Sequence, residues 1–389
     1  MNRSTPELPP LALYIHTPWC VKKCPYCDFN SHNAADTLPE QSYLQALLQD
    51  LDSEMESVQG RSIHSIFIGG GTPSLLSPSF YDRLFVQLNK RLHIPTEAEV
   101  TLEANPGTFE QRRFSGFRAA GINRLSIGVQ SFDDAALARL GRIHSAEQAA
   151  FAVAIARRAG FDNINLDLMH GLPDQTAALA LLDVRQAITL EPDHISWYQL
   201  TIEPNTLFWR HRPQLPAENT LADIEQQGQI ALRESAYLSY EISAYSRPAR
   251  QSSHNINYWQ FGDFIGLGAG AHGKLTRLGS GQIKRRWKTR LPARYITAPE
   301  GRRHKERTLS QEDLVIEFMM NALRLKSGVT AELFTHRTGL PLTVIEQRVA
   351  EARRRQLMTD DPLRLCASSK GQRFLNELLD LFCPEPNSD

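Results

Sequence analysis

Three cysteines lie close together near the start of the chain, in the segment IHTPWCVKKCPYCDF, and their thiolates are suitable ligands for iron or zinc. Cys20, Cys24 and Cys27 follow the spacing C-x3-C-x2-C. The same spacing would fit one face of a helix, but Pro18 and Pro25 disfavour a regular helix here. We therefore predict that a loop presents the three thiolates.

Two kinds of metal site fit this loop. Three thiolates can hold three irons of a cubane cluster, which leaves the fourth iron open to a substrate or cofactor. The alternative is a zinc site of three cysteines and one histidine, with His16 or His32 as the fourth ligand. We favour the cluster, because zinc ribbons usually contribute cysteines as C-x2-C pairs. The remaining Cys366 and Cys383 are distant in sequence and are predicted to be inert reduced thiols.

The elements that position this loop alternate between short apolar runs and longer segments of helical periodicity, from residue 11 to about residue 245. Strands are predicted at 11–16, 63–68, 99–104, 122–129, 163–169 and 194–200. The intervening helices are predicted at 40–58, from 78 onwards, at 108–120, 131–140, 145–159, 176–190 and 219–237. This alternation implies parallel strands with right-handed crossovers, in a doubly wound sheet or in a whole or incomplete barrel.

Polar residues follow each predicted strand, at the edge where parallel α/β folds bind ligands. The second strand runs into a glycine turn, Gly69 to Gly71 followed by Thr72 and Pro73, which either brings backbone N–H groups close to a ligand or is a plain tight turn. The other strand ends carry Glu103, Gln130, Asp167, Gln199 and Thr201. With the cysteine loop on the same rim, these residues predict one shared pocket for a polar ligand.

The second half of the chain gives weaker signals. Residues 240–246 suggest one more strand, and the Lys- and Arg-rich segment 274–307 is predicted to be a solvated hinge or surface ribbon. From residue 309, helical segments indicate a small, mostly helical C-terminal domain of winged-helix type. We therefore divide the chain into a tail (1–10), a barrel (11–245), an extension (246–300) and a C-terminal domain (301–389).

Composition excludes several classes of protein. The 389 residues include 43 basic and 43 acidic side chains, so no overall charge attracts nucleic acid or an anionic membrane surface. No apolar run is long enough to span a membrane, and the opening residues lack the apolar core of a signal peptide. Five cysteines, three of them crowded together, argue against a secreted disulfide framework. We predict a cytoplasmic protein.

Several motifs together resemble the radical S-adenosylmethionine (SAM) superfamily. They are the cysteine motif after the first strand, the GGGTP turn after the second, and LEANPG, RLSIGVQSF, LGRIH and NLDLMHGLPDQT. The match is to the branch that contains oxygen-independent coproporphyrinogen III oxidases and HemW-type heme chaperones. The resemblance implies an α/β fold with an incomplete (β/α)6 barrel and a C-terminal domain of the type found in that branch.

The same resemblance implies two cofactors and their ligands. A 4Fe-4S cluster would be held by Cys20, Cys24 and Cys27, and SAM would chelate the open iron through its amino and carboxylate groups. Polar contacts to the cluster or to SAM are implied for Tyr14, Tyr26, Gly70, Gly71, Thr72, Glu103, Gln130, Arg142 and Asp167.

Two features separate the chaperones from the oxidases. The oxidases resemble C-x3-C-x2-C-x-C, whereas this chain has Phe29 at the last position, as the chaperones do. The segment from His254 to Trp259 resembles the HNxxYW motif proposed for heme binding, in which the histidine would be an axial ligand of heme iron. Without the resemblance, a structural histidine beside two core aromatic residues is the alternative. We predict a heme chaperone, which passes heme to an unidentified acceptor protein, rather than the alternative, a coproporphyrinogen III oxidase.

Overall fold

One open, twelve-stranded sheet organises the molecule, in the order β14-β13-β12-β11-β1-β4-β5-β6-β7-β8-β10-β9. We describe it from a computed structural model, which covers residues 8–298 and 303–384. The six predicted strands are present and pair in parallel in chain order. They are β1 (Leu11–Thr17), β4 (Ile63–Gly70), β5 (Glu99–Ala104), β6 (Arg124–Gln130), β7 (Ile164–His170) and β8 (His194–Gln199).

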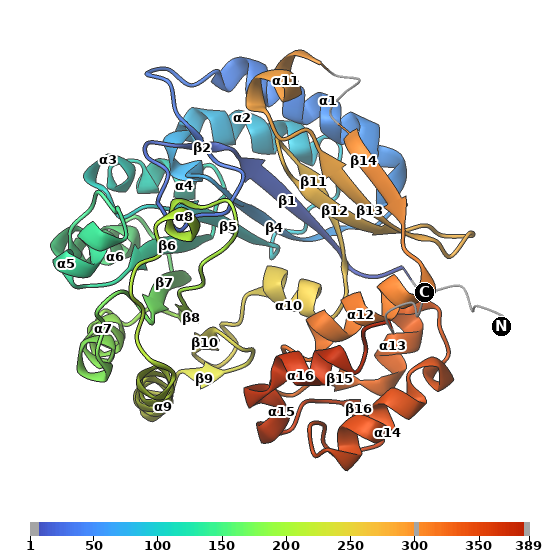
Figure 1. Cartoon of the computed structure of the whole chain (residues 1–389). Coiled ribbons are helices and arrows are strands. Elements are labelled where there is room, and N and C mark those ends of the chain that lie inside the picture. Colours follow the sequence, from blue (N-terminus) through green and yellow to red (C-terminus); the bar gives the residue numbers. More distant parts are fainter. Residues whose placement is uncertain (1–7, 299–302, 385–389) are drawn as a thin grey trace.

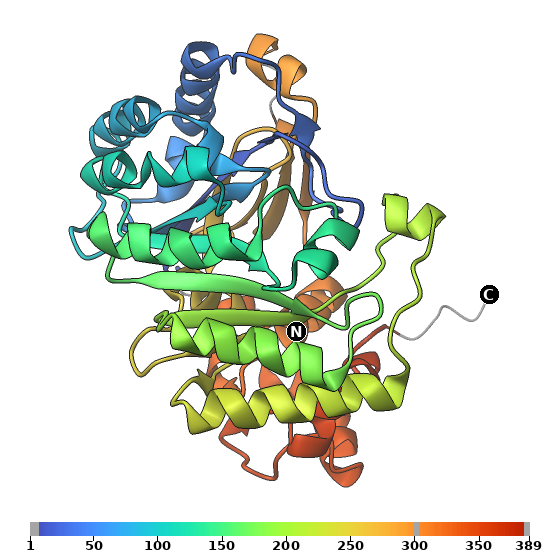
Figure 2. The same cartoon turned by 90° about the vertical axis from the view of Figure 1, so that its left-hand side faces the viewer.

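Helices cover the outer face of these strands, and the strands curve around the interior (Figure 1). Figure 2 shows α6, α7 and α9 stacked over that outer face. The helices of this layer are α1 (Glu40–Val58), α2 (Pro78–Asn89), α3 (Thr108–Gln111), α4 (Phe114–Ala119), α5 (Asp134–Arg139), α6 (Ala146–Arg158), α7 (Ala177–Thr189) and α9 (Glu218–Glu234). Local signals set their starts: Ser77 caps α2 with Pro78 in its first turn, and Ser145 forms a capping box with Gln148.

One helix prediction was wrong. The segment 108–120 is divided between α3 and α4, because the chain leaves the helix at Arg112 and Arg113. The Arg113 guanidinium donates to the carbonyl oxygens of Leu75 (2.8 Å) and Leu76 (3.2 Å) at the turn after β4. The break thus ties α3 and α4 to the neighbouring strand end.

The resemblance predicted an incomplete barrel, and the sheet indeed stays open. At one edge, β11 (Asp263–Leu267) pairs in parallel with β1, and β12 (His272–Thr276), β13 (Ile283–Lys288) and β14 (Arg303–Thr308) extend it antiparallel. At the other edge, β10 (Ala244–Ser246) and β9 (Leu238–Ser239) follow β8 antiparallel. The predicted strand 240–246 is therefore shorter than expected and turns back on the sheet.

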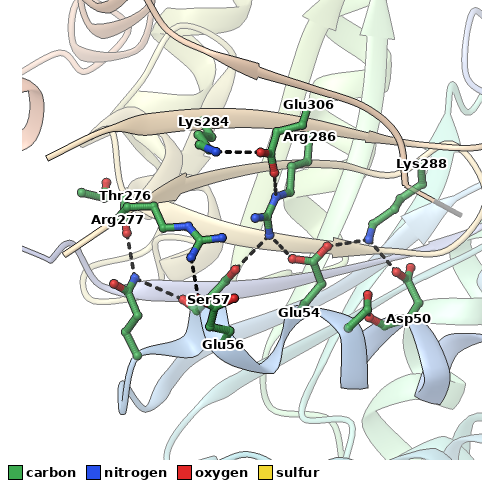
Figure 3. A network of polar contacts seen from close by, with 12 residues as sticks. Asp50, Glu54, Glu56, Ser57, Thr276, Arg277, Lys284, Arg286, Lys288 and Glu306 are labelled. Atoms are coloured by element: carbon green, nitrogen blue, oxygen red, sulfur yellow. Dashed lines mark hydrogen bonds and ion pairs between the residues drawn. The ribbon is translucent and has the colours of Figure 1, made fainter. Parts of the chain in front are cut away.

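The basic segment 274–307 is not a solvated ribbon, and that prediction was wrong. Strands β12 to β14 lie in it, and Lys274, Arg286 and Lys288 are at most 3% exposed. Acidic side chains of α1 neutralise two of these cations: Lys288 Nζ lies 2.5 Å from Asp50 and 2.8 Å from Glu54, and Arg286 also contacts Glu54 (Figure 3). Buried cations are tolerated here because each has a buried carboxylate partner.

The C-terminal part is mostly helical, as predicted. It contains α12 (Gln311–Ala322), α13 (Ala331–Thr338), α14 (Glu346–Arg354), α15 (Ser369–Arg373) and α16 (Leu375–Asp380), with a small antiparallel pair, β15 (Val329–Thr330) and β16 (Arg364–Leu365). Its apolar core also includes Tyr240, Phe261 and Ile283 of the sheet region. This part and α10 (Ser253–Trp259) therefore lie where the sheet stays open (Figure 1). Within the described residues, no helix has the length and apolarity of a membrane span.

Candidate functional site

The cysteine loop lies at the carboxyl end of β1, as the sequence predicts. A short parallel pair, β2 (Trp19–Cys20) with β3 (His32–Asn33), closes the loop at its base, and within it Cys27 N donates to Cys24 O at 3.2 Å. The three thiols line one cavity of about 290 Å³. Burial raises the pKa of Cys20 and of Cys27, so a positively charged ligand is needed to hold them as thiolates.

The glycine turn after β4 is tied to this loop and is more than a plain tight turn. Gly71 N donates to Thr17 O at 2.6 Å, and Thr72 N donates to Trp19 O at 2.7 Å. Gly70 has a φ of +112°, and a Cβ there would lie 2.5 Å from the His16 ring; one on Gly71 would lie 2.5 Å from Trp19 O. Larger residues do not fit, so the glycines bring bare backbone to the cavity wall.

Two carboxyl groups line the same cavity as the cysteines. Glu103 accepts a hydrogen bond from Gly70 N at 3.0 Å, and Asp167 accepts bonds of 2.8 Å from both Ser126 Oγ and Asn165 Nδ2. Burial, together with the nearby Asp167, raises the pKa of Glu103 to about 8. Neither carboxyl group forms an ion pair with a described residue. A ligand that brings positive charge would therefore stabilise this wall.

Arg142 supplies the positive charge on the side of the cysteines. Its guanidinium donates to Asn105 Oδ1 at 2.7 Å and to Gly128 O at 2.8 Å, and lies 3.7 Å from Cys24 Sγ. These bonds hold it in the wall of the cavity. Gln130, at a bulge in β6 with a φ of +69°, accepts a hydrogen bond from the Tyr198 hydroxyl at 2.8 Å. The cavity wall therefore carries thiols, a cation beside one of them, and carboxyl groups.

Most of the predicted site residues meet in this cavity. Those that line it are Cys20, Cys24, Tyr26, Cys27, Gly70, Gly71, Thr72, Glu103, Gln130, Arg142 and Asp167. Tyr14 is not among the residues that line it. Its hydroxyl lies 3.0 Å from His16 Nδ1, and His16 Nε2 lies 2.9 Å from Asn30 O. Tyr14 thus holds the ring of His16, and that ring packs against Gly70 in the cavity wall.

The same contacts bear on the zinc alternative. Both ring nitrogens of His16 are already hydrogen-bonded, so His16 does not offer a free ligand. In residues 8–298 and 303–384, no three His, Cys, Asp or Glu side chains gather as ligands of a single metal ion. The three thiols line one cavity without converging on a single point. This arrangement suits a cluster, because each cysteine then binds a different iron.

Sequence reasoning missed several cavity residues, among them Asn105, Ser126 and Tyr198, and besides Tyr14 it included Gln199 and Thr201, which also lie outside the cavity. Gln199 and Thr201 are exposed to solvent. Successive side chains of a strand point to opposite faces, so Tyr198 faces the cavity and Gln199 does not. Counting alternate residues along HISWYQL would have identified Tyr198.

His254 lies apart from this cavity, in the first turn of α10, and is 1% exposed. Its Nδ1 lies 3.0 Å from Ser65 Oγ and its Nε2 lies 3.0 Å from the Tyr258 hydroxyl. The ring also stacks on Phe67, with centroids 5.1 Å apart. This is the geometry of a structural histidine, and heme ligation by His254 stays a prediction that requires one of these two hydrogen bonds to break.

Comparison with known proteins agrees with the geometry. The radical SAM superfamily pattern matches residues 14–182, and the HemN C-terminal domain pattern matches residues 309–374. The heme chaperone HemW of Haemophilus influenzae is 48% identical over 98% of this chain and all of that protein, and HemW of Escherichia coli K12 is 49% identical over 97% of this chain and all of that protein.

Solved structures show the same fold. Coproporphyrinogen III oxidase (HemN) from Escherichia coli, described as a radical SAM enzyme, superimposes with a TM-score of 0.81 over 96% of this chain and 90% of that one. Its sequence identity is 22%, so this likeness establishes the fold alone. Full-length similarity to the HemW proteins is far higher, and this chain therefore belongs to the HemW family of the radical SAM superfamily.

Proposed function

We propose that this protein is a heme chaperone, which binds heme and passes it to an acceptor protein. The observation that carries the proposal is the identity of 48–49% to two proteins named as heme chaperones, over nearly the whole chain. Phe29 supports it, since the resemblance gives the oxidases a further cysteine at this place. The acceptor is unidentified, and we propose that both proteins meet in the cytoplasm.

We further propose that the cavity of about 290 Å³ holds a 4Fe-4S cluster and SAM. The residues fit both groups: Cys20, Cys24 and Cys27 are soft ligands for iron, and the carboxyl groups suit a ligand with a sulfonium and an amino group. When bound, the cluster would supply redox chemistry to the cofactor. The chain itself contributes the bare backbone of the glycine turn, the charges of Glu103 and Asp167, and the Arg142 guanidinium beside Cys24.

Glu103→Gln should weaken SAM binding to the cluster-loaded protein by about 10- to 100-fold, the range expected for the loss of a charged hydrogen-bond partner. Because the pKa of Glu103 is about 8, its carboxylate forms as the pH rises from 7 to 9, and attraction to the cationic cofactor grows over that interval. Anaerobic titration calorimetry at several pH values should show this rise in the wild type and a smaller one in the variant.

Glu110→Gln is the matched control, since Glu110 is also a buried carboxyl group but does not line this cavity. Its affinity for SAM should equal that of the wild type. Equal pH profiles for wild type and Glu103→Gln would remove Glu103 from the cofactor site.

The porphyrin product of an anaerobic assay distinguishes the chaperone from the oxidase alternative. The cluster-loaded protein is incubated anaerobically with coproporphyrinogen III, a reductant and SAM, and the porphyrins are separated by chromatography. A chaperone leaves the propionate side chains intact. A vinyl-bearing product would overturn the proposal in favour of oxidative decarboxylation.

A further inference from the structure

A second and larger cavity, of about 1090 Å³, lies beside the cofactor cavity and has no role in the function described so far. It is bordered by the cysteine loop, by residues 34–42 at the start of α1, by residues 105–113, and by residues 141–148, which include the start of α6. Both cavities share residues of the wall between them, including Lys22, Cys24 and Arg142. A ligand in the larger cavity would therefore lie next to the cluster loop.

Size and the presence of a histidine together separate this cavity from the other candidates for a macrocycle. Sites for small molecules and cofactors usually measure about 300–1,000 Å³. The cavity beside Tyr258 and Trp259 measures about 160 Å³, and the cofactor cavity of about 290 Å³ is already assigned. A further cavity, of about 560 Å³ beside Tyr240 and Leu325, has no His, Cys or Met in its wall. Among these four, the larger cavity alone combines the volume for a porphyrin with a histidine.

His144 stands in the wall of this cavity with one ring nitrogen held and the other open. Its Nε2 lies 3.0 Å from Val129 O, so Nε2 carries the hydrogen and donates it. Its Nδ1 makes no hydrogen bond with any residue of the described ranges. Burial, and secondarily Arg142, lowers the pKa of His144 to about 4, so the ring is neutral at pH 7. A neutral imidazole fixed by a backbone carbonyl is the usual state of a metal-bound histidine.

The rest of the wall is mixed: it has aliphatic side chains, the carboxyl groups of Asp36, Glu40 and Glu110, and a larger number of cations, Lys22, Arg83, Arg113 and Arg142. The aliphatic side chains can contact an apolar ring, and the cations can pair with its anionic side chains. Val21 is 56% exposed and Ile143 is 66% exposed, although both are aliphatic. Lys22 lines both this cavity and the cofactor cavity and forms no ion pair or hydrogen bond with a described residue. An ammonium group of this kind can pair with a carboxylate of a ligand.

We propose that this cavity holds the heme, with His144 Nδ1 as an axial ligand of the iron and Lys22 beside the propionates. The proposal rests on the proposed chaperone function and names the site at which it operates. It differs from the expectation for His254, whose two ring nitrogens are both hydrogen-bonded inside the protein. Heme would then lie beside the cluster loop, not at α10.

The test is a titration with ferric heme, followed by Soret absorbance, of wild type, His144→Gln, His144→Gly and His254→Ala. His144→Gln keeps an N–H that can reach Val129 O but lacks the ligand, and should lower heme affinity by at least about tenfold, a loss that even changes around a metal ligand produce. His144→Gly should bind heme weakly and recover the wild-type spectrum when free imidazole is added. His254→Ala should bind as the wild type does.

The outcomes are distinct. Unchanged affinity and spectrum in both His144 variants, or no recovery with imidazole, overturns the assignment of His144 while leaving the chaperone function intact. A loss confined to His254→Ala places the heme at α10 instead. Absence of heme binding by the wild type contradicts the proposed function itself. Circular dichroism and iron content show whether each variant is folded and loaded.

Lys22→Glu gives a second measurement that does not touch His144. It should weaken heme binding severalfold, because it sets a negative charge beside the propionates. Lys90→Glu, at the exposed end of α2, is the matched control and should not change the affinity. Equal affinities for the two variants would remove Lys22 from the proposed site.

Discussion

Cys24→Ala should reduce the iron and acid-labile sulfide of the anaerobically reconstituted protein from about four of each per chain to near zero, because a cubane cluster needs each of its protein thiolates. The expectation follows from the placement of the three cysteines on one cavity, where Cys24 also contacts Arg142. Loss of one ligand leaves two irons open, and such a cluster decays. The measurement is chemical analysis of iron and sulfide, together with the absorbance of the cluster.

Cys366→Ala is the control for this loss. Cys366 is a buried free thiol in the C-terminal part, outside the cofactor cavity, and its replacement should leave iron and sulfide unchanged. Stoichiometric zinc with no sulfide in the wild type would contradict the cluster and restore the zinc alternative. Equal loss of iron in both variants would mean that the cysteines act on folding.

Lys288→Met should lower the free energy of unfolding by about 3–5 kcal/mol, the usual result of leaving buried charges without a partner. Lys288 is 3% exposed and lies between Asp50 and Glu54 of α1 (Figure 3). Arg286 still contacts Glu54 in the variant, but of the described residues only Tyr295 still offers the Asp50 carboxylate a side-chain hydrogen bond, from its hydroxyl at 2.7 Å. Urea unfolding followed by circular dichroism measures the loss.

The pH dependence of this variant has a definite sign. Burial raises the pKa of Asp50, and the Lys288 ammonium opposes that rise. Without Lys288 the pKa rises further above its value in the unfolded chain, so the folded variant binds a proton that the unfolded chain releases. The free energy of unfolding of the variant therefore decreases as the pH increases from about 4 through the raised pKa.

Lys284→Met is the matched control on the same strand. Lys284 pairs with Glu306 at 2.7 Å, but the two side chains are 21% and 27% exposed. A pair so open to solvent contributes about 0–1 kcal/mol. If both variants lost the same free energy of unfolding, the buried contacts of Lys288 with α1 would stabilise the fold no more than an exposed ion pair does.

The sequence predicted the six parallel strands because each is a short apolar run bounded by clear helix signals. It did not predict β12 to β14, whose lysines and arginines resemble a solvated surface. Their neutralising partners, Asp50 and Glu54, lie more than two hundred residues earlier in the chain. No local pattern can show such pairing, since it exists only once α1 has packed beside β13.

The candidate site was predictable to a similar degree. The cysteines and Glu103, Gln130 and Asp167 could be found because parallel strands end at one edge. The sequence could not show which ring nitrogens of the two histidines, His144 and His254, are hydrogen-bonded within the protein. His254 is satisfied by Ser65, from a distant strand, and the open nitrogen of His144 is visible only when its bond to Val129 O is known.

The most direct test of the chaperone account is the absorbance spectrum of the cluster-loaded wild-type protein under anaerobic conditions, before and after addition of ferric heme. The account predicts a broad cluster absorbance without heme, and a protein-bound Soret band that saturates at a fixed ratio of heme to chain and is lost when an apo-heme protein is added as acceptor. A spectrum equal to the sum of free heme and protein at all ratios would contradict it.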